Sequence, residues 1–233
     1  LPTSMRIADL MGMGCGGALP NLSVAMGMLA ADPEKPVVSV AVEICTATLF
    51  MGTDPGLIVS NSIFGDGASA AVLAHRAMAT SADPGSDGLA VQVLDYESGL
   101  FPQHRAQLQY RTEDHRLRNV LGSRVPAIGA WAIHEVAGRL LKRNGLAQGD
   151  ISHWAVHPGG TAVLRSVART FGLSGDELRH SYHVFEHFGN MSSPSVMFVL
   201  QRLMDAENPA PGDYGLLLSF GAGFSAYAVL VRF

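Results

Sequence analysis

The chain of 233 residues is 48% hydrophobic and only 15% charged, well below the roughly 25% charge of an average soluble domain. This composition excludes an intrinsically disordered chain, and the net charge of −4 gives no broad attraction to nucleic acid or to an anionic membrane. The two cysteines, Cys15 and Cys45, are too few for a disulfide framework or a cysteine-rich zinc site. Since no basic n-region with a cleavage site opens the chain, we expect a cytoplasmic protein with neither nucleic acid nor membrane as partner.

The predicted elements of the first part begin at a Gly-Gly pair. Gly16-Gly17 precede an amphipathic helix over residues 18–30, and a β-branched strand follows over residues 37–42. Residues 57–73 are predicted as two strands joined around an FGDG sequence. The segment 79–88 is rich in Gly, Pro, Ser and Asp and is therefore the predicted linker.

The second part shows a similar layout. A helix is predicted over residues 130–143, and a strand over residues 153–156 leads into Gly159-Gly160 and a helix over residues 161–171. Residues 216–231 are predicted as two strands joined around an FGAG turn. Alternating helices and apolar strand blocks indicate a layered α/β fold.

Two sequence pairs recur in the same order. Gly-Gly followed after five residues by Ser-Val-Ala begins at Gly16 and again at Gly159, and FGDGASA from Phe64 corresponds to FGAGFSA from Phe220. Two ordered matches indicate an internal duplication. We therefore predict halves at residues 1–78 and 89–233, joined by the linker at 79–88.

The segment 214–232 is apolar and nearly long enough to cross a bilayer. Gly221 and Gly223 interrupt it in the middle, and continuous apolar runs bounded by turn signals are typical of strands buried on both faces. Two buried strands are the favoured interpretation over a transmembrane helix.

Three polar residues lie in separate glycine-containing turns. Cys15 stands just before a predicted helix, where the unpaired N–H groups of the helix favour a thiolate. His157 follows a predicted strand in HPGG, and Asn190 lies in FGNMSS. Each has a plain structural alternative (a small buried cysteine, a strand-end histidine, an Asx turn), but together they form a set that suits a nucleophile, its base and a hydrogen-bond donor.

The chain resembles a known family at these positions. The sequences MGMGCGG around Cys15, VEICTATLF from Val42, FGDGASA from Phe64, HPGG from His157 and GNMSS from Gly189 are similar to those of type III polyketide synthases. These are the chalcone synthase-like acyltransferases of the thiolase superfamily. The resemblance implies an α/β, thiolase-like layered αβαβα fold from an internal duplication, with the N-terminal part of the first half absent.

The resemblance also implies roles for individual residues. Cys15 would accept the acyl group and pair with His157 as thiolate and imidazolium, while His157 and Asn190 would form the oxyanion hole. Around these catalytic residues, the matching substrate-binding positions are Phe64 beside the cysteine, Gly159 and Ala162 on the CoA arm, and Cys45, Thr48 and Ser192 in the cavity wall.

The chain departs from the family pattern in two places. Family members carry a long stretch before the reactive cysteine, whereas only fourteen residues precede Cys15. We therefore expect the C-terminal part of such an enzyme, with a missing N-terminal segment of the same protein and a homodimeric assembly. The second gate residue expected from the family, an aromatic side chain, has no clear match in LRNVLGSRVP (117–126). Either Arg124 or no residue takes its place.

The predicted function is that of a type III polyketide synthase for secondary metabolite biosynthesis. A starter from acyl-CoA would be loaded on Cys15, extended by decarboxylative Claisen condensation with malonyl-CoA, and cyclised. No metal and no cofactor is expected beyond the CoA thioester substrates, because loss of CO₂ supplies the carbanion. The alternatives are a single-condensation enzyme resembling ketoacyl-ACP synthase III and a truncated, non-catalytic paralogue that acts as a dimer partner.

Two further groups favour plain interpretations. His183 and His187 have a metal-ligand spacing but lack an accompanying carboxylate motif, which favours a surface or interface pair. Five arginines between 105 and 124 alternate with acidic residues and histidines, which favours a solvated, salt-bridged segment over a phosphate site.

Overall fold

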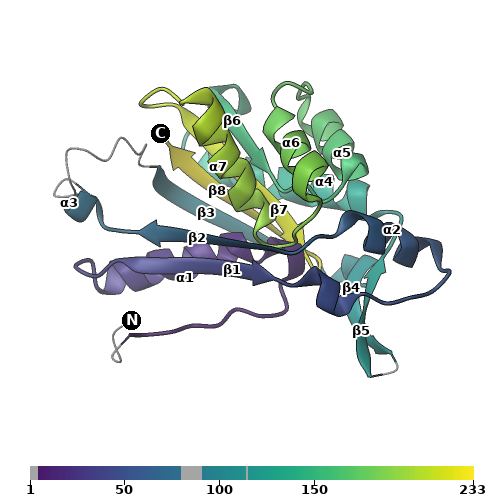
Figure 1. The fold of residues 1–233 in the computed structure, drawn as a ribbon. Coiled ribbons are helices and arrows are strands. Elements are labelled where there is room, and N and C mark those ends of the chain that lie inside the picture. Colours follow the sequence, from purple (N-terminus) through teal and green to yellow (C-terminus); the bar gives the residue numbers. More distant parts are fainter. Residues whose placement is uncertain (1–4, 80–90, 114) are drawn as a thin grey trace.

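The computed structural model describes residues 5–79, 91–113 and 115–233 of the chain, whose arrangement is shown in Figure 1. The elements up to residue 79 are η1 (Gly14–Gly16), α1 (Ala18–Ala31), β1 (Val37–Glu43), η2 (Cys45–Thr48), α2 (Pro55–Ile63), β2 (Gly67–Leu73) and α3 (Arg76–Ala79). The remaining elements are β3 (Gln92–Leu100), η3 (Pro102–Gln107), β4 (Leu108–Glu113), β5 (Arg116–Leu121), α4 (Val125–Arg143), η4 (Gln148–Asp150), β6 (Ile151–Val156), α5 (Thr161–Phe171), α6 (Arg179–Phe188), α7 (Ser195–Glu207), β7 (Tyr214–Gly221) and β8 (Ser225–Arg232).

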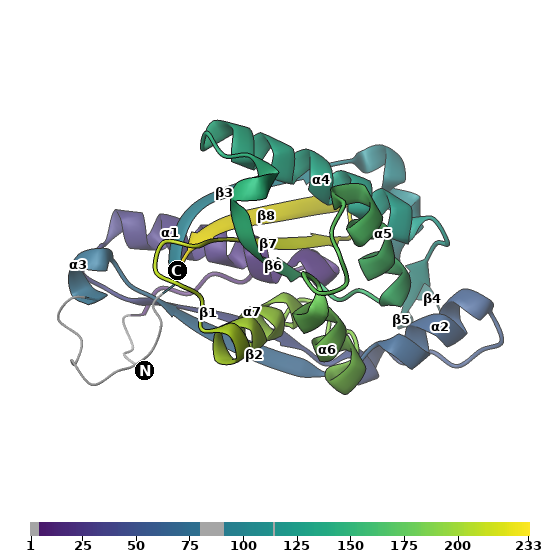
Figure 2. The same cartoon turned by 90° about the horizontal axis from the view of Figure 1, so that it is seen from above.

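The strands form one four-stranded sheet and two antiparallel pairs. The sheet has the order β3-β8-β7-β6, in which β6 runs parallel to β7 and the other neighbours are antiparallel. The pair β1-β2 and the hairpin β4-β5 stand apart from it. Figure 2 shows α4 and α5 on one side of the four-stranded sheet and α7 on the other.

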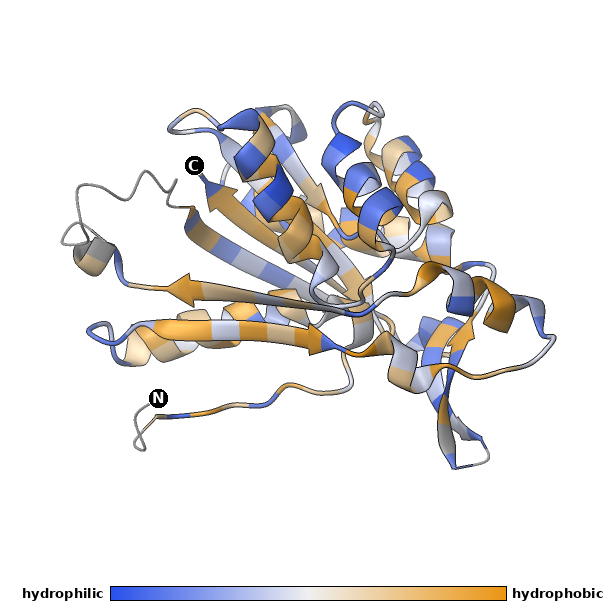
Figure 3. Ribbon diagram, viewed as in Figure 1, coloured by the Kyte–Doolittle hydropathy of each residue, from blue (hydrophilic) through white to orange (hydrophobic). Residues whose placement is uncertain are grey.

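Helices α1 and α7 form the layer between the two sheets. Each of them contacts both the four-stranded sheet and the β1-β2 pair. The described residues therefore stack as helices, sheet, helices and sheet, which confirms a layered α/β fold. Of the five layers of the expected αβαβα order, the outer helix layer on β1-β2 is not among these residues. The outer face of β1-β2 is apolar and exposed, and Figure 3 shows the apolar character of these two strands.

Strands β7 and β8 are buried on both faces, as their continuous apolar sequence predicts. Leu216 and Leu218 of β7 pack into the core beneath α4, whereas Leu217 packs into the core beneath α1 and α7. The apolar segment is thus two central strands rather than a transmembrane helix. No helix among the described residues is both apolar enough and long enough to span a bilayer.

The predicted two strands at 57–73 are wrong in their first half. Residues 55–63 form α2, because the Asp54 side chain accepts a hydrogen bond of 3.0 Å from the Leu57 amide and Pro55 occupies the first turn. An acidic N-cap followed by proline is a helix start signal that outweighs the short apolar run. Only β2 remains as a strand in this segment.

The order of the elements supports the predicted duplication, but one of the two sequence matches pairs different helices. Helix α1 precedes the antiparallel strands β1 and β2, with η2 and α2 between them, and α7 precedes the antiparallel strands β7 and β8. The FGDGASA and FGAGFSA match agrees with this pairing, since it relates β2 to β8. The Gly-Gly match instead pairs α1 with α5, after which α6 and α7 still intervene before the strands.

The helix predicted over residues 130–143 ends where expected and starts earlier, at Val125, with Pro126 in its first turn. The predicted linker at 79–88 lies outside the described residues except for Ala79, so the boundary between the halves at 1–78 and 89–233 stays a prediction.

Candidate active site

Cys15 lies in the short helix η1, one turn before α1, and is a buried free thiol. Two glycines allow this turn to pack tightly against the end of the β7-β8 hairpin. A Cβ atom on Gly16 would overlap the Tyr227 ring, and one on Gly221 would overlap the Met13 carbonyl oxygen. The thiol is therefore held at the carboxyl end of β7 by backbone contact that only glycine permits.

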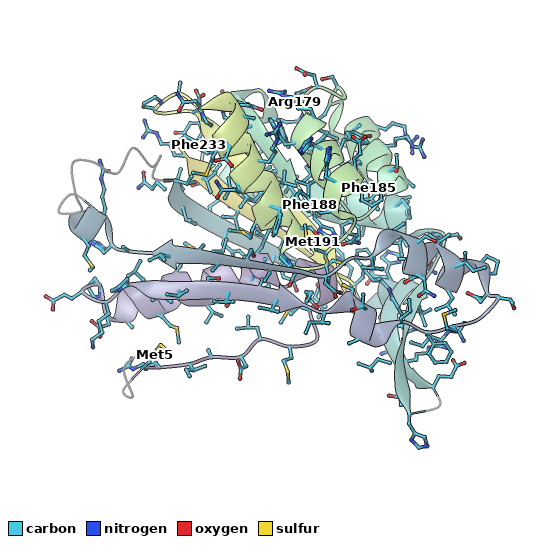
Figure 4. All side chains as sticks on the ribbon, viewed as in Figure 1. Met5, Arg179, Phe185, Phe188, Met191 and Phe233 are labelled. Carbon is cyan, nitrogen blue, oxygen red and sulfur yellow. The ribbon has the colours of Figure 1, made fainter. Side chains whose placement is uncertain are left out.

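Asn190 lies in the turn that separates α6 from α7, and it is almost fully buried. Gly189 before it has φ +68°, and the Asn190 amide donates to the Ile63 carbonyl at 2.7 Å. The Gly65 amide in turn donates to the Asn190 carbonyl at 3.0 Å, so the FGDG and GNMSS segments are joined as a short parallel bridge. Figure 4 shows the neighbouring Met191 near the point where the base of α7 approaches β2.

His157 follows the last residue of β6, and its backbone amide donates to the Leu218 carbonyl of β7 at 2.8 Å. Its ring is buried and lies edge-on to the Phe220 ring, with 6.2 Å between the centroids. Both ring nitrogens are buried without a hydrogen-bond partner. Unpartnered nitrogens at a strand end are a feature of a functional site rather than of a structural histidine.

The structure brings these three residues together. The Cys15 Sγ lies 4.0 Å from the Asn190 Oδ1 and 3.9 Å from the Asn190 Nδ2. Cys15, His157, Asn190 and Phe64 all line one cavity of about 920 Å³. Residues that are 175 positions apart along the chain thus share a single site.

Burial dominates the ionisation of the site. It raises the pKa of the Cys15 thiol to about 11, although the side chains of Ser192 and Asn190 oppose the shift. Burial also lowers the pKa of His157 to about 3. Each group taken alone is therefore neutral at pH 7, and charge separation between them requires that His157 take up the thiol proton directly.

The other predicted positions fall into three groups. Gly159 and Ala162 line the same cavity at the start of α5. Cys45 and Thr48, in η2, line a smaller cavity of about 60 Å³ to which Phe64 also belongs. Ser192 lines neither cavity. It is buried, and its amide donates to the Asn190 Oδ1 at 2.8 Å.

Cys45 is less suited to nucleophilic chemistry than Cys15. Burial, together with the nearby Cys15 and acidic groups, raises the pKa of the Cys45 thiol to about 12. A thiol with this pKa is almost entirely protonated at neutral pH. Its role as a wall residue of the substrate cavity stays a prediction, and the structure places it in the wall of the smaller cavity.

Two walls of the main cavity are absent from the sequence-based prediction. One is α2, and the other is the β4-β5 hairpin, where residues 108–113 and 116–121 pair. Within the hairpin, Arg118 bonds Glu113 at 2.8 Å, as expected for a salt-bridged segment, but both side chains also line the cavity. Arg124 is the N-cap residue of α4 and does not line the cavity, whereas Asn119 does.

The described residues contain no group of three or more His, Cys, Asp or Glu side chains placed to hold a metal ion. His183 and His187 stack on α6 with 4.0 Å between ring centroids, and the His187 Nδ1 lies 2.8 Å from the His183 carbonyl oxygen. They thus form a pair of neighbouring rings on one helix.

Comparisons with known proteins find relatives over nearly the whole chain. Residues 94–233 match the family model described as "Chalcone and stilbene synthases, C-terminal domain", and residues 1–84 match the one described as "FAE1/Type III polyketide synthase-like protein". The chain is 36% identical to a 3,5-dihydroxyphenylacetyl-CoA synthase of Streptomyces toyocaensis, over 97% of this chain and 57% of the relative. It is 31% identical to a 1,3,6,8-tetrahydroxynaphthalene synthase of Streptomyces peucetius subsp. caesius, over 98% of this chain and 59% of the relative.

Solved structures give the same result. The crystal structure of 1,3,6,8-tetrahydroxynaphthalene synthase from Streptomyces coelicolor superimposes with a TM-score of 0.86 at 27% identity, covering 100% of this chain and 64% of that one. The structure of PKS-I from the brown alga Ectocarpus siliculosus gives a TM-score of 0.84 at 29% identity, covering 94% of this chain and 58% of that one. The chain therefore spans somewhat more than half the length of the proteins that it matches.

Proposed function

This chain belongs to the chalcone and stilbene synthase family of type III polyketide synthases, and from this premise we propose that the whole protein condenses acyl-CoA with malonyl-CoA. The observation that carries the proposal is the buried Cys15 thiol, which lies within 4.0 Å of the Asn190 amide in the cavity that His157 also lines. A thiol, an imidazole and an amide in one cavity provide a nucleophile, a base and an oxyanion donor.

Loading is the first proposed step. His157 accepts the Cys15 proton, and the resulting thiolate attacks the carbonyl carbon of the acyl-CoA. The bond between this carbon and the CoA sulfur breaks, and the CoA thiolate leaves with the proton that His157 holds. Because the Cys15 and His157 charges appear together in a buried site, their mutual attraction offsets part of the desolvation cost.

Extension is the second step. Malonyl-CoA loses CO₂, and the electron pair of the broken carbon–carbon bond becomes an enolate, whose oxygen accepts hydrogen bonds from His157 and the Asn190 amide. The enolate carbon attacks the Cys15 thioester, and the Cys15 thiolate leaves. Because decarboxylation supplies the carbanion, this chemistry uses no metal and no redox cofactor.

The walls of the cavity support several extensions and a cyclisation. The cavity of about 920 Å³, which the CoA arm and the growing chain would share, lies within the range of about 300–1,000 Å³ that is common for ligand pockets. A single-condensation enzyme would need less room. Gly159 and Ala162 lie at the start of α5, where we assign the CoA arm, and Cys45, Thr48 and Phe64 border the part that limits chain length.

The names of two relatives suggest the class of product that this protein makes. Their names specify 3,5-dihydroxyphenylacetyl-CoA and 1,3,6,8-tetrahydroxynaphthalene, which are hydroxylated aromatic compounds. We assign a product of this class to the present protein, made by a homodimer in which each subunit carries its own cysteine.

The test is intact-protein mass spectrometry of the full-length protein after incubation with a panel of acyl-CoAs. We expect an acyl adduct that maps to Cys15, and no adduct with Cys15→Ala. Malonyl-CoA added next should give released product with several added carbon pairs. Adducts that persist in Cys15→Ala would contradict the assignment of Cys15 as the nucleophile. A full-length protein that takes up no acyl group would contradict the enzyme function and favour a non-catalytic dimer partner.

A further inference from the structure

Asn119 of β5 has a polar atom for which the protein provides no partner. The residue is 9% exposed, and its Nδ2 donates to the Ser60 Oγ of α2 at 3.0 Å. Its Oδ1 is buried and has no hydrogen-bond partner. Because buried acceptors in native proteins are almost always satisfied, this oxygen is available to a donor from outside the chain.

The position of Asn119 identifies where that donor would come from. Asn119 lines both the main cavity and the smaller cavity beside it, and Phe64 also lines both. The smaller cavity measures about 60 Å³. A site for one small polar group needs only roughly 10–15 Å³ of such space. The Asn119 side chain therefore forms part of the wall of both cavities.

The Nδ2 of the Asn119 amide faces α2. The bond to Ser60 holds the Nδ2 side, and Ser60 is itself buried in the middle of its helix. The free atom is then the carbonyl oxygen, which accepts but cannot donate. Ketone oxygens also only accept, so they gain nothing from this atom, whereas the hydroxyl of an enol or a phenol can donate to it.

We propose that Asn119 determines specificity by accepting a hydrogen bond from a hydroxyl group of the acyl or polyketide chain held in the cavity. The inference rests on the proposed function, because it assumes an acyl chain that extends from Cys15 into this cavity. Asn119 then favours starters that carry a hydroxyl, and it favours enolised over ketonic stages of the growing chain. A site that contains a buried acceptor also disfavours chains that leave it unpaired.

The test measures binding in the Cys15→Ala background of the full-length protein, where no acyl transfer can occur. The probes are pairs of acyl-CoAs of increasing chain length, each pair identical except for a terminal hydroxyl. Calorimetry gives the ratio of the two dissociation constants at each length. We expect one acyl chain length at which the hydroxylated member of the pair binds about threefold to tenfold more tightly than the other, because one neutral hydrogen bond contributes this much to binding.

The variants at position 119 decide whether this preference depends on the amide. Asn119→Leu and Asn119→Ala should both reduce the ratio to about one. Leucine is similar in size to asparagine. The smaller alanine tests the same point if the Asn119→Leu protein does not fold. Asn119→Asp keeps an acceptor and should retain the preference. Asn61→Leu is the matched control, because Asn61 borders the same small cavity but its amide already donates to the Phe50 carbonyl at 2.9 Å.

The outcomes separate this inference from the proposed function. A hydroxyl preference that is absent at every chain length, or that survives both Asn119→Leu and Asn119→Ala, overturns the inference, even when acyl adducts form normally on Cys15. A preference that disappears in both variants supports it. Because binding is measured without acyl transfer, a failure of acylation in the wild-type protein leaves this result readable and counts against the proposed function alone.

Discussion

Burial would leave Cys15 unreactive at neutral pH unless another group removes its proton. With a pKa of about 11, the thiolate fraction at pH 8 is only about one part in a thousand. His157 is the group in the same cavity that can take the proton, since both of its ring nitrogens lack a partner. We therefore expect the reactivity of Cys15 to depend on His157 as a base rather than on its own position before α1.

The rate of Cys15 alkylation should reveal this dependence. In His157→Ala, burial remains the main influence on the pKa of the thiol, so the rate with iodoacetamide should rise about tenfold per pH unit and show no plateau below pH 9. The wild-type protein should react at least about tenfold faster at pH 8, because proton transfer to His157 supplies thiolate at lower pH. Quenched reactions quantified by peptide mass spectrometry give the alkylation rate against pH for the wild type and for His157→Ala. Identical pH profiles would show that His157 does not activate the thiol.

At the scale of elements, the site depends on how closely η1 approaches the end of β7. The Cβ of an alanine at position 221 would overlap the Met13 carbonyl oxygen and lie 2.8 Å from the Gly16 amide nitrogen. Both are backbone atoms, so neither can rotate away as a side chain would. The tight packing of η1, and with it Cys15, against the central sheet thus requires a residue without a Cβ atom at position 221.

Gly221→Ala should therefore displace η1 and destabilise the fold by about 1–3 kcal/mol or more. Acyl transfer to Cys15 should fall further than the loss of folded protein explains. Gly138→Ala is the control, because a Cβ at this position in α4 meets nothing within 4 Å, and alanine should stabilise a helix by about 0.5–1 kcal/mol. Thermal unfolding of both variants tests the pair, and equal melting temperatures would refute the steric argument.

At the scale of the whole molecule, the two β layers are covered unequally. The four-stranded sheet has helices on both faces, whereas one face of β1-β2 lies bare among the described residues. Four valines on that face are each more than half exposed: Val38, Val40, Val42 and Val72. An exposed apolar face of this kind is typical of a contact surface.

We expect the 233-residue polypeptide by itself to self-associate through this face. Val40→Lys places a charge in the middle of it and should raise the monomer fraction in sedimentation velocity. Gly175→Lys adds the same charge on a surface turn and should leave the distribution unchanged. A polypeptide that is monomeric at all concentrations without any substitution would contradict the role of this face.

Local sequence determined the elements whose signals are strong. The apolar run interrupted by Gly221 and Gly223 predicts β7 and β8 correctly, because two-sided burial requires continuous apolar residues. The glycine-containing turns around Cys15, His157 and Asn190 identify the candidate site, since each motif is short and contiguous. Asp54-Pro55 also carries the signal for α2, but the apolar pattern after it favours a strand.

The tertiary structure alone decided which of these segments meet. Asn190 reaches Cys15 because backbone hydrogen bonds join its turn to the FGDG segment, 126 residues earlier at Phe64. The equivalence of α1 with α7 and the free acceptor of Asn119 likewise depend on packing between elements distant in sequence. A side chain's chemical type can be known from its own position, but its partners, its burial and hence its pKa are properties of the neighbours that folding brings to it.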